Sequence, residues 1–75
     1  MELLIFGSLT DIIGTNKQVI DTPVDTEMLK ASLLQQYPSL GQVPYFIAIN
    51  KTMVQGNHPL QEGDVVALMP AFSGG

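Results

Sequence analysis

The sequence predicts a single α+β domain in which one main helix packs on one face of a mixed five-stranded sheet. Five short apolar runs have the length and spacing of strands, whereas only one stretch repeats apolar residues at helical spacing. With 75 residues, 45% of them hydrophobic, and no cysteine, the chain can build one modest core from apolar packing alone. A helix on one face of a sheet is the economical two-layer arrangement for such a core.

The N-terminal part is expected to contain two strands with a short helix between them. Leu3–Phe6 is apolar at every position and is followed by a glycine, which predicts the first strand. Ser8 is placed to cap a short helix over Leu9–Ile13, and Gly14 is placed to end it in a left-handed conformation. The run Lys17–Asp21 then predicts the second strand.

The main helix is the clearest element of the sequence. Asp25 is a favourable N-cap, and an apolar residue recurs every fourth position at Leu29, Leu33 and Tyr37. This spacing predicts one apolar stripe. Pro38 is expected to end the helix, because the residue before a proline is pushed out of helical geometry.

Three further strands are expected after a loop over residues 39–44. Asn50-Lys51 predicts a polar hairpin turn between the first two of them, and Pro70 is expected to end the last one. The runs predicted as strands are Tyr45–Ile49, Thr52–Val54 and Val65–Met69.

In the predicted first and last strands, the side chains that point to either face of the sheet are apolar. The helix, however, can cover only one of these faces. The residues predicted to face the helix are Leu3, Ile5, Val54, Val66 and Leu68. The residues that parity then sends to the open face are Leu4, Phe6, Met53, Ala67 and Met69. An exposed apolar patch of this kind predicts a protein partner, and cover by a loop or the C-terminal tail is the alternative.

Charge and hydropathy exclude several classes of function. Three lysines against seven acidic residues give a net charge of −4, which argues against binding to nucleic acid or to an anionic membrane. No apolar run approaches the roughly 20 residues of a membrane span, and Met1-Glu2 lacks the basic start of a signal peptide. We therefore expect a cytoplasmic protein.

The ionisable side chains form no catalytic or metal-binding set. His58 is the only histidine and is expected to serve a turn, and Asp64 after a glycine is expected to cap the turn before the last strand. Without a grouped base, nucleophile and metal ligands, the sequence does not predict an independent enzyme.

The C-terminal residues predict a tail that other proteins handle. Residues 1–70 are expected to form the domain, and residues 71–75 a flexible tail that ends in Gly74-Gly75. The α-carboxylate of Gly75 is ionised at neutral pH and is a poor electrophile, so acyl chemistry there requires activation by another protein.

Three places carry a family resemblance: FGSLTDIIGT at residues 6–15; AINKTMV at residues 48–54, with His58-Pro59-Leu60 and Glu62-Gly63-Asp64-Val65 following it; and the terminal SGG. In these segments the chain resembles the sulfur-carrying small subunits of molybdopterin synthases, which are ubiquitin-like β-grasp proteins. The likeness covers most of the chain apart from the second strand and the main helix, which match only in pattern.

The resemblance implies a non-catalytic, sulfur-donating subunit of a transferase complex. An adenylyltransferase similar to ubiquitin-activating enzymes would use ATP to adenylate the Gly75 carboxylate, and a persulfide sulfur would then yield a thiocarboxylate. The large synthase subunit, in an expected heterotetramer, would supply the catalytic side chains that pass this sulfur to a pyranopterin precursor of the molybdenum cofactor. The domain itself is expected to bind no cofactor and no metal.

The resemblance also assigns residues. Gly75 is the sulfur acceptor and Gly74 its slim neighbour. Phe6, Met53 and Met69 match apolar partner contacts, which are the same residues that parity places on the open face. In the tail, where the family often has a second proline, this chain has Ala71-Phe72 instead. The residues expected there as partner contacts are Phe72, as an aromatic anchor, and Ser73; a lid on the domain itself is the alternative role for Phe72.

Three alternatives remain at the level of sequence. The first is a sulfur carrier for another pathway, such as the thiazole of thiamin, although the helical insert at Leu9–Gly14 favours molybdopterin. The second is a ubiquitin-like modifier joined to lysines. The third is an interaction domain in which Gly74-Gly75 has no function.

Overall fold

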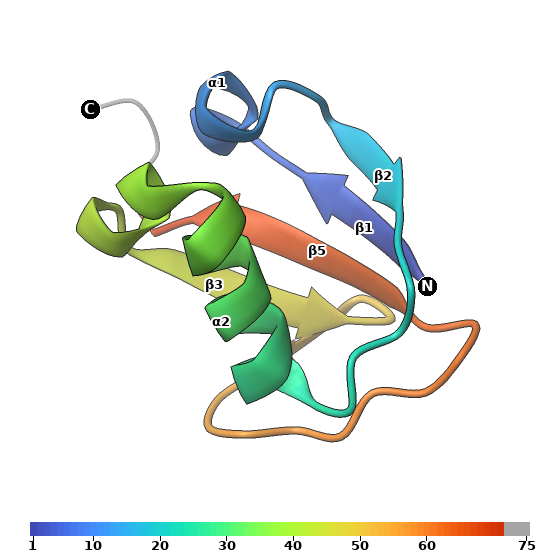
Figure 1. The fold of residues 1–75 in the computed structure, drawn as a ribbon. Helices are drawn as coiled ribbons and strands as arrows, with labels where there is room; N and C mark the ends of the chain where they lie inside the picture. Colours follow the sequence, from blue (N-terminus) through green and yellow to red (C-terminus); the bar gives the residue numbers. More distant parts are fainter. Residues whose placement is uncertain (72–75) are drawn as a thin grey trace.

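The structure, a computed structural model, describes residues 1–71 and has the α+β architecture predicted from the sequence. Its five-stranded mixed sheet has the order β2-β1-β5-β3-β4, in which the central pair β1 and β5 is parallel and the other pairs are antiparallel (Figure 1). In chain order the elements are β1 (Glu2–Ile5), α1 (Leu9–Ile13), β2 (Lys17–Val19), α2 (Thr26–Gln36), η1 (Pro38–Gln42), β3 (Tyr45–Ile49), β4 (Thr52–Val54) and β5 (Val65–Pro70).

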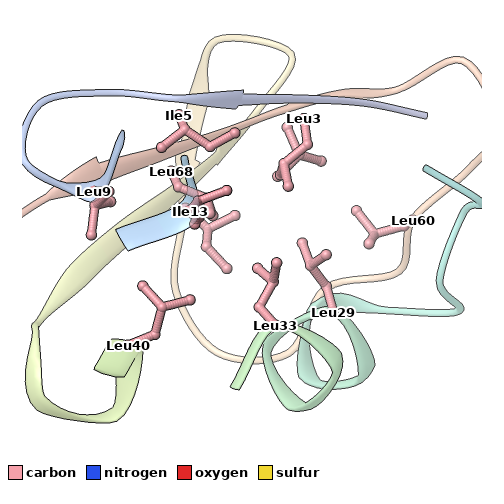
Figure 2. Packing of buried hydrophobic residues seen from close by; sticks show 11 residues of the cluster. Leu3, Ile5, Leu9, Ile13, Leu29, Leu33, Leu40, Leu60 and Leu68 are labelled. Atoms are coloured by element: carbon pink, nitrogen blue, oxygen red, sulfur yellow. The ribbon is translucent and has the colours of Figure 1, made fainter. Parts of the chain in front are cut away.

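One hydrophobic core lies between α2 and the sheet. Leu29 and Leu33 of α2 point toward the sheet, and Leu3 of β1 lies opposite them (Figure 2). Leu9 of α1 and Leu40 of η1 belong to the same cluster, so the two short helices extend the core beyond the main one. The predicted parity is confirmed for Leu3, Ile5, Val66 and Leu68, which are buried on this face, and for Val54, which packs against them. Ile47 of β3 is buried on the same face.

Two polar clusters fix the N-terminal end of α2. The carboxylate of Asp25 accepts a hydrogen bond from the Met28 amide at 2.9 Å, so the predicted N-cap is confirmed. Thr26 is the one buried polar residue of residues 1–71. Its amide donates to the His58 carbonyl at 2.9 Å, and its hydroxyl accepts from the His58 amide at 3.0 Å. His58 thus supports the helix through its main chain, in agreement with the predicted turn role.

The predicted cap of the short helix α1 is wrong at its N-terminus. The Ser8 side chain makes no capping hydrogen bond, and Ser8 itself has helical dihedral angles. Instead, the Thr10 hydroxyl donates to the Gly7 carbonyl at 2.8 Å. The C-terminal prediction is confirmed, because Gly14 has φ 89° and its amide donates to the Thr10 carbonyl at 2.8 Å.

Several element boundaries differ from the predicted ones. Residues expected as loop after α2 form η1, in which Pro38 occupies the first turn that tolerates a missing N–H group. Strand β5 includes Pro70, one residue beyond its predicted end, and β1 ends one residue early, at Ile5. Strand β2 ends at Val19, although the Ile20 amide still donates to the Met1 carbonyl at 3.0 Å.

Replacing Thr26 with valine tests the polar support of α2. Thr26→Val keeps the shape of the side chain but leaves the His58 amide without its acceptor, so we expect a loss of about 1–3 kcal/mol in the free energy of unfolding. Urea denaturation followed by circular dichroism measures this loss. Thr52→Val, at an exposed position of β4, is the matched control and should change stability little; equal losses in the two variants would contradict the assigned role.

Candidate functional site

The open face of the sheet carries an apolar groove with a volume of about 490 Å³. We call it the sheet groove. Strands β1, β3, β4 and β5 contribute to it together with the turn between β3 and β4. The residues that line it are Leu4, Phe6, Ala48, Asn50, Lys51, Met53, Val65, Ala67 and Met69.

Strand register explains why this face is hollow. Ala67 of β5 pairs with Leu4 of β1 on one side and with Ala48 of β3 on the other. Ala48 in turn pairs with Met53 of β4. Side chains of paired residues stand on the same face, so two alanines form a floor between longer side chains at its edges. The hollow therefore follows from residue size along one row of the sheet.

The walls of the sheet groove expose large apolar side chains to solvent. Phe6 is 46% exposed and Met53 is 53% exposed, while Met69 is half-buried. Phe46 pairs with Met69 and is itself exposed, which extends the apolar surface along β3. Methionine adapts its unbranched thioether to a partner's shape, and contiguous apolar surface of this kind marks protein interaction sites.

A rigid turn forms the polar end of the sheet groove. Asn50 and Lys51 have φ values of 50° and 74°, which are typical of the two central residues of a tight hairpin turn. The predicted turn is therefore confirmed. The Asn50 side chain donates to the Asp64 carboxylate at 3.0 Å and accepts from the Val65 amide at 3.0 Å. These bonds join the turn to the start of β5 and hold Lys51 at the rim.

Asp64 is the partner of the Asn50 side chain in this arrangement, and we call the pair the Asn50–Asp64 clamp. Its carboxylate also accepts from the Gln61 amide at 2.9 Å, which confirms the predicted role in the turn before β5. The hydrogen bonds from Gln61 and Asn50 hold the pKa of the Asp64 carboxyl below its usual value, because they stabilise the ionised form. Asp64 therefore supports the rim as an acceptor.

The chain leaves the sheet beside the sheet groove. Pro70 pairs with Tyr45, and the Ala71 amide donates to the Pro44 carbonyl at 3.1 Å. Hydrogen-bonded structure thus continues through Ala71, the first residue of the predicted tail. The residues expected to carry the chemistry and to contact a partner there lie outside the described residues; they are Phe72, Ser73, Gly74 and Gly75.

The structure brings together the three predicted site residues that it describes. Met53 of β4, Met69 of β5 and Phe6, the residue after β1, line one groove. The predicted site set omitted the floor and the polar rim. Parity along β3 could have identified Ala48, whereas the placement of Lys51 depends on a turn geometry that a dipeptide only suggests.

Other kinds of site were sought in residues 1–71. This part of the chain has no group of three or more His, Cys, Asp or Glu side chains that could hold a metal ion. None of its helices combines the length and hydropathy required to cross a membrane. The sheet groove, with its mostly apolar lining, is the candidate binding site in this part of the chain.

Comparison with known proteins identifies the family. The family model described as the ThiS family matches residues 3–75, nearly the whole chain. The chain belongs to the ThiS family. The matched range includes the residues that line the sheet groove and the C-terminal residues.

Two relatives of this ThiS-family chain carry the same name. It is 29% identical over 80 residues to a protein of Escherichia coli strain K12 named molybdopterin synthase sulfur carrier subunit, covering 100% of this chain and 99% of the relative. A protein of the same name from Chlamydomonas reinhardtii is 31% identical over 81 residues, covering 100% and 98%.

A solved structure has the same fold. It is described as a protein–protein complex of subunits 1 and 2 of molybdopterin-converting factor from Helicobacter pylori 26695. The chain matched in that complex is 30% identical, with a TM-score of 0.71, and the match covers 99% of this chain and 96% of the other. The ubiquitin-like β-grasp architecture expected from the resemblance is thereby supported by both sequence and structure.

The Asn50–Asp64 clamp predicts a dependence of stability on pH. The folded-state pKa of Asp64 lies below the ordinary value of 3.8, so the ionised carboxylate stabilises the fold above about pH 3.8. This contribution is lost as the pH falls below 3.8 and through the folded-state pKa. Asp64→Asn should therefore be less stable than the wild type at neutral pH and lose less stability on acidification.

Urea midpoints measured from neutral to strongly acidic pH test this expectation. Asp25 contributes in the same direction, because hydrogen bonds from Met28 and Asn57 lower its pKa, so the Asp64→Asn curve should be shallower but not flat. Asp21→Asn, at an exposed position, serves as the control. If Asp64→Asn and the wild type lose stability in parallel, protonation of the Asp64 carboxyl does not cause the loss of stability at acidic pH.

Proposed function

We propose that this chain is the sulfur-carrier subunit of a molybdopterin synthase. The observation that carries the proposal is the sheet groove beside the end of β5, in a ThiS-family chain whose last residues are Gly74-Gly75. A groove suited to docking and a narrow segment that follows it are the two parts that a carrier needs. The near-complete coverage of two curated sulfur carriers supports this function.

The proposed partner at the sheet groove is the large subunit of the synthase. The exposed walls formed by Phe6 and Met53 offer apolar surface that gains free energy when a partner removes it from water. The alanine floor leaves room for a protruding apolar side chain of the partner. The structural neighbour is one subunit of a two-subunit converting factor, which supports a partner of this kind.

The chemistry belongs to the Gly75 carboxylate. An ATP-dependent adenylyltransferase joins this carboxylate to AMP with release of pyrophosphate, which creates a good leaving group at the carboxyl carbon. The outer sulfur of a persulfide donor then attacks this carbon and displaces AMP, which gives an acyl disulfide. A second thiol cleaves the S–S bond of this intermediate, so that the donor leaves in a new disulfide and the chain keeps the outer sulfur as a thiocarboxylate. Glycine at 74 suits a confined path to both enzymes, because it adds no side chain next to the reacting carbon. ATP is thus used by the partner enzyme.

The product sets the stoichiometry. The dithiolene of molybdopterin holds two sulfur atoms, so each pyranopterin precursor consumes two charged carriers. The large subunit supplies the catalytic groups for this transfer, and a heterotetramer with two carriers and two large subunits is the proposed assembly. We propose that the cycle takes place in the cytoplasm, where ATP is available to the activating enzyme.

The relatives favour this pathway over the alternatives. Both curated carriers and the structural neighbour are named for molybdopterin synthesis, so a role in forming the thiazole of thiamin is not favoured. The same names disfavour a modifier that is joined to lysines.

Intact-mass measurement tests the acceptor. Incubation with an adenylyltransferase of this class, ATP, a persulfide donor and a thiol reductant should raise the mass of the chain by about 16 Da, the difference between sulfur and oxygen. A variant that lacks Gly75 should show no gain. A wild-type chain that never gains this mass under conditions that charge the E. coli relative would refute the sulfur-carrier function.

A charge placed in the sheet groove tests the docking surface. Met53→Asp places a carboxylate on a groove wall that loses its contact with water when the partner binds. We therefore expect the Kd for the large subunit to rise by about 100-fold or more. Met28→Asp is the matched control, because Met28 is 57% exposed, compared with 53% for Met53, but lies on α2. Calorimetric titration measures both, and equal weakening would place the docking surface elsewhere.

A further inference from the structure

Gly7 and Pro70 are in close contact where β1 gives way to α1 and β5 ends. A Cβ atom built on Gly7 would lie 2.8 Å from Pro70 Cγ and 3.3 Å from Pro70 Cδ. Side chains do not approach each other this closely, so the proline ring fills the space that any other residue at position 7 would need. Gly7 also has φ 58°, in the left-handed region that favours glycine.

The alternation of β5 explains why a proline fits here inside a sheet. The Phe6 amide donates to the Leu68 carbonyl at 3.0 Å, so the polar groups of Leu68 point toward β1. Backbone groups two residues apart point the same way, and Pro70 therefore turns its nitrogen to that side as well. Strand β1 has ended by then, and Gly7 offers the ring packing in place of a hydrogen bond. Because β1 has already ended, the missing N–H of Pro70 removes no hydrogen bond between the two strands.

The opposite side of β5 is also held. Pro70 pairs with Tyr45 of β3, and the next amide, that of Ala71, donates to the Pro44 carbonyl at 3.1 Å. The end of β5 is thus fixed by ring packing on one side and by a hydrogen bond on the other. Phe6, a wall of the sheet groove, is covalently joined to Gly7. One contact therefore links the groove wall to the point at which the chain leaves the sheet.

We propose that Gly7 is a positioning residue for the C-terminal segment: its missing side chain seats Pro70, and this contact fixes where the chain leaves the sheet relative to the sheet groove. The proposal rests on the proposed function, because it assigns a purpose to that fixed exit. A partner docked on the groove then meets the start of the tail at one position. Fixing this position beforehand lowers the entropy lost on reaching the partner's reaction centre.

This role separates docking from delivery. A methyl group at position 7 must displace the Pro70 ring, and with it the start of the tail, while the exposed groove walls keep their chemistry. Gly7→Ala should therefore leave the Kd for the large subunit within about threefold of wild type but slow sulfur transfer from the bound carrier by about tenfold or more.

A neighbouring glycine supplies the matched control. Gly14 has φ 89°, and a Cβ atom there would meet nothing within 4 Å. Gly14→Ala thus imposes the same kind of backbone strain without a collision. Both variants are charged to the thiocarboxylate and bound to saturating large subunit, and single-turnover transfer to the pyranopterin precursor is timed. We expect slow transfer from Gly7→Ala and near wild-type transfer from Gly14→Ala; equal rates, or a Gly7→Ala defect that lies only in Kd, would overturn the proposal.

A double variant tests the contact itself. Pro70→Ala removes the two ring atoms that a methyl group at position 7 would meet. Gly7→Ala combined with Pro70→Ala should therefore transfer sulfur faster than Gly7→Ala alone, although the backbone strain at position 7 is the same. No recovery would show that the collision with Pro70 is not the cause. Pro70→Ala alone introduces no collision but removes the ring packing against Gly7. It therefore tests the contact even if Gly7→Ala fails to fold. We expect Pro70→Ala to slow sulfur transfer and to leave the Kd for the large subunit nearly unchanged.

Hydrogen exchange at Ala71 gives a readout that does not depend on sulfur chemistry. The Ala71 amide should exchange about tenfold faster in Gly7→Ala than in wild type and be unaffected in Gly14→Ala, because only the first displaces its neighbour Pro70. Unchanged exchange in Gly7→Ala would overturn the positioning role. If exchange responds as expected but wild-type chain transfers no sulfur, the proposed function fails and the structural coupling stands.

Discussion

The alternation of side chains along β1 and β5 is the constraint on which the rest of the structure depends. Both central strands are apolar at nearly every position, yet residues 1–71 contain only one helix long enough to cover a face of the sheet. The face under α2 becomes the core, and no helix or strand within residues 1–71 covers the second apolar face. The sheet groove is therefore a consequence of strand composition combined with a shortage of helix.

Much of this arrangement could be predicted because it depends on local patterns. The main helix has a cap, a stripe and a stop within a few residues of one another, and the structure places α2 between Asp25 and Pro38 as these signals indicate. Parity sorted the residues of β1 and β5 correctly between the two faces, since a strand offers only two directions. The three described site residues, Phe6, Met53 and Met69, were found by the same alternation.

The remainder depends on pairing between distant segments. Ser8 has the composition of a cap, but Thr10 makes the side-chain hydrogen bond to Gly7, and no local pattern separates the two candidates. The proline at position 70 reads as a strand breaker in isolation; its inclusion in β5 follows from the early end of β1, which is a property of another strand. The hollow of the groove likewise needs Ala48 to lie beside Ala67, a fact of register.

The alanine floor has a consequence for how such a carrier acquires its partners. Ala48 and Ala67 face away from the core under α2, so larger side chains there would fill the hollow without overpacking the interior. Substitutions at these two positions can therefore change which side chain of a partner fits the sheet groove, with little effect on folding. Among carriers of one architecture, the volumes of these two side chains in the middle of the sheet would therefore set how deep a groove each carrier offers.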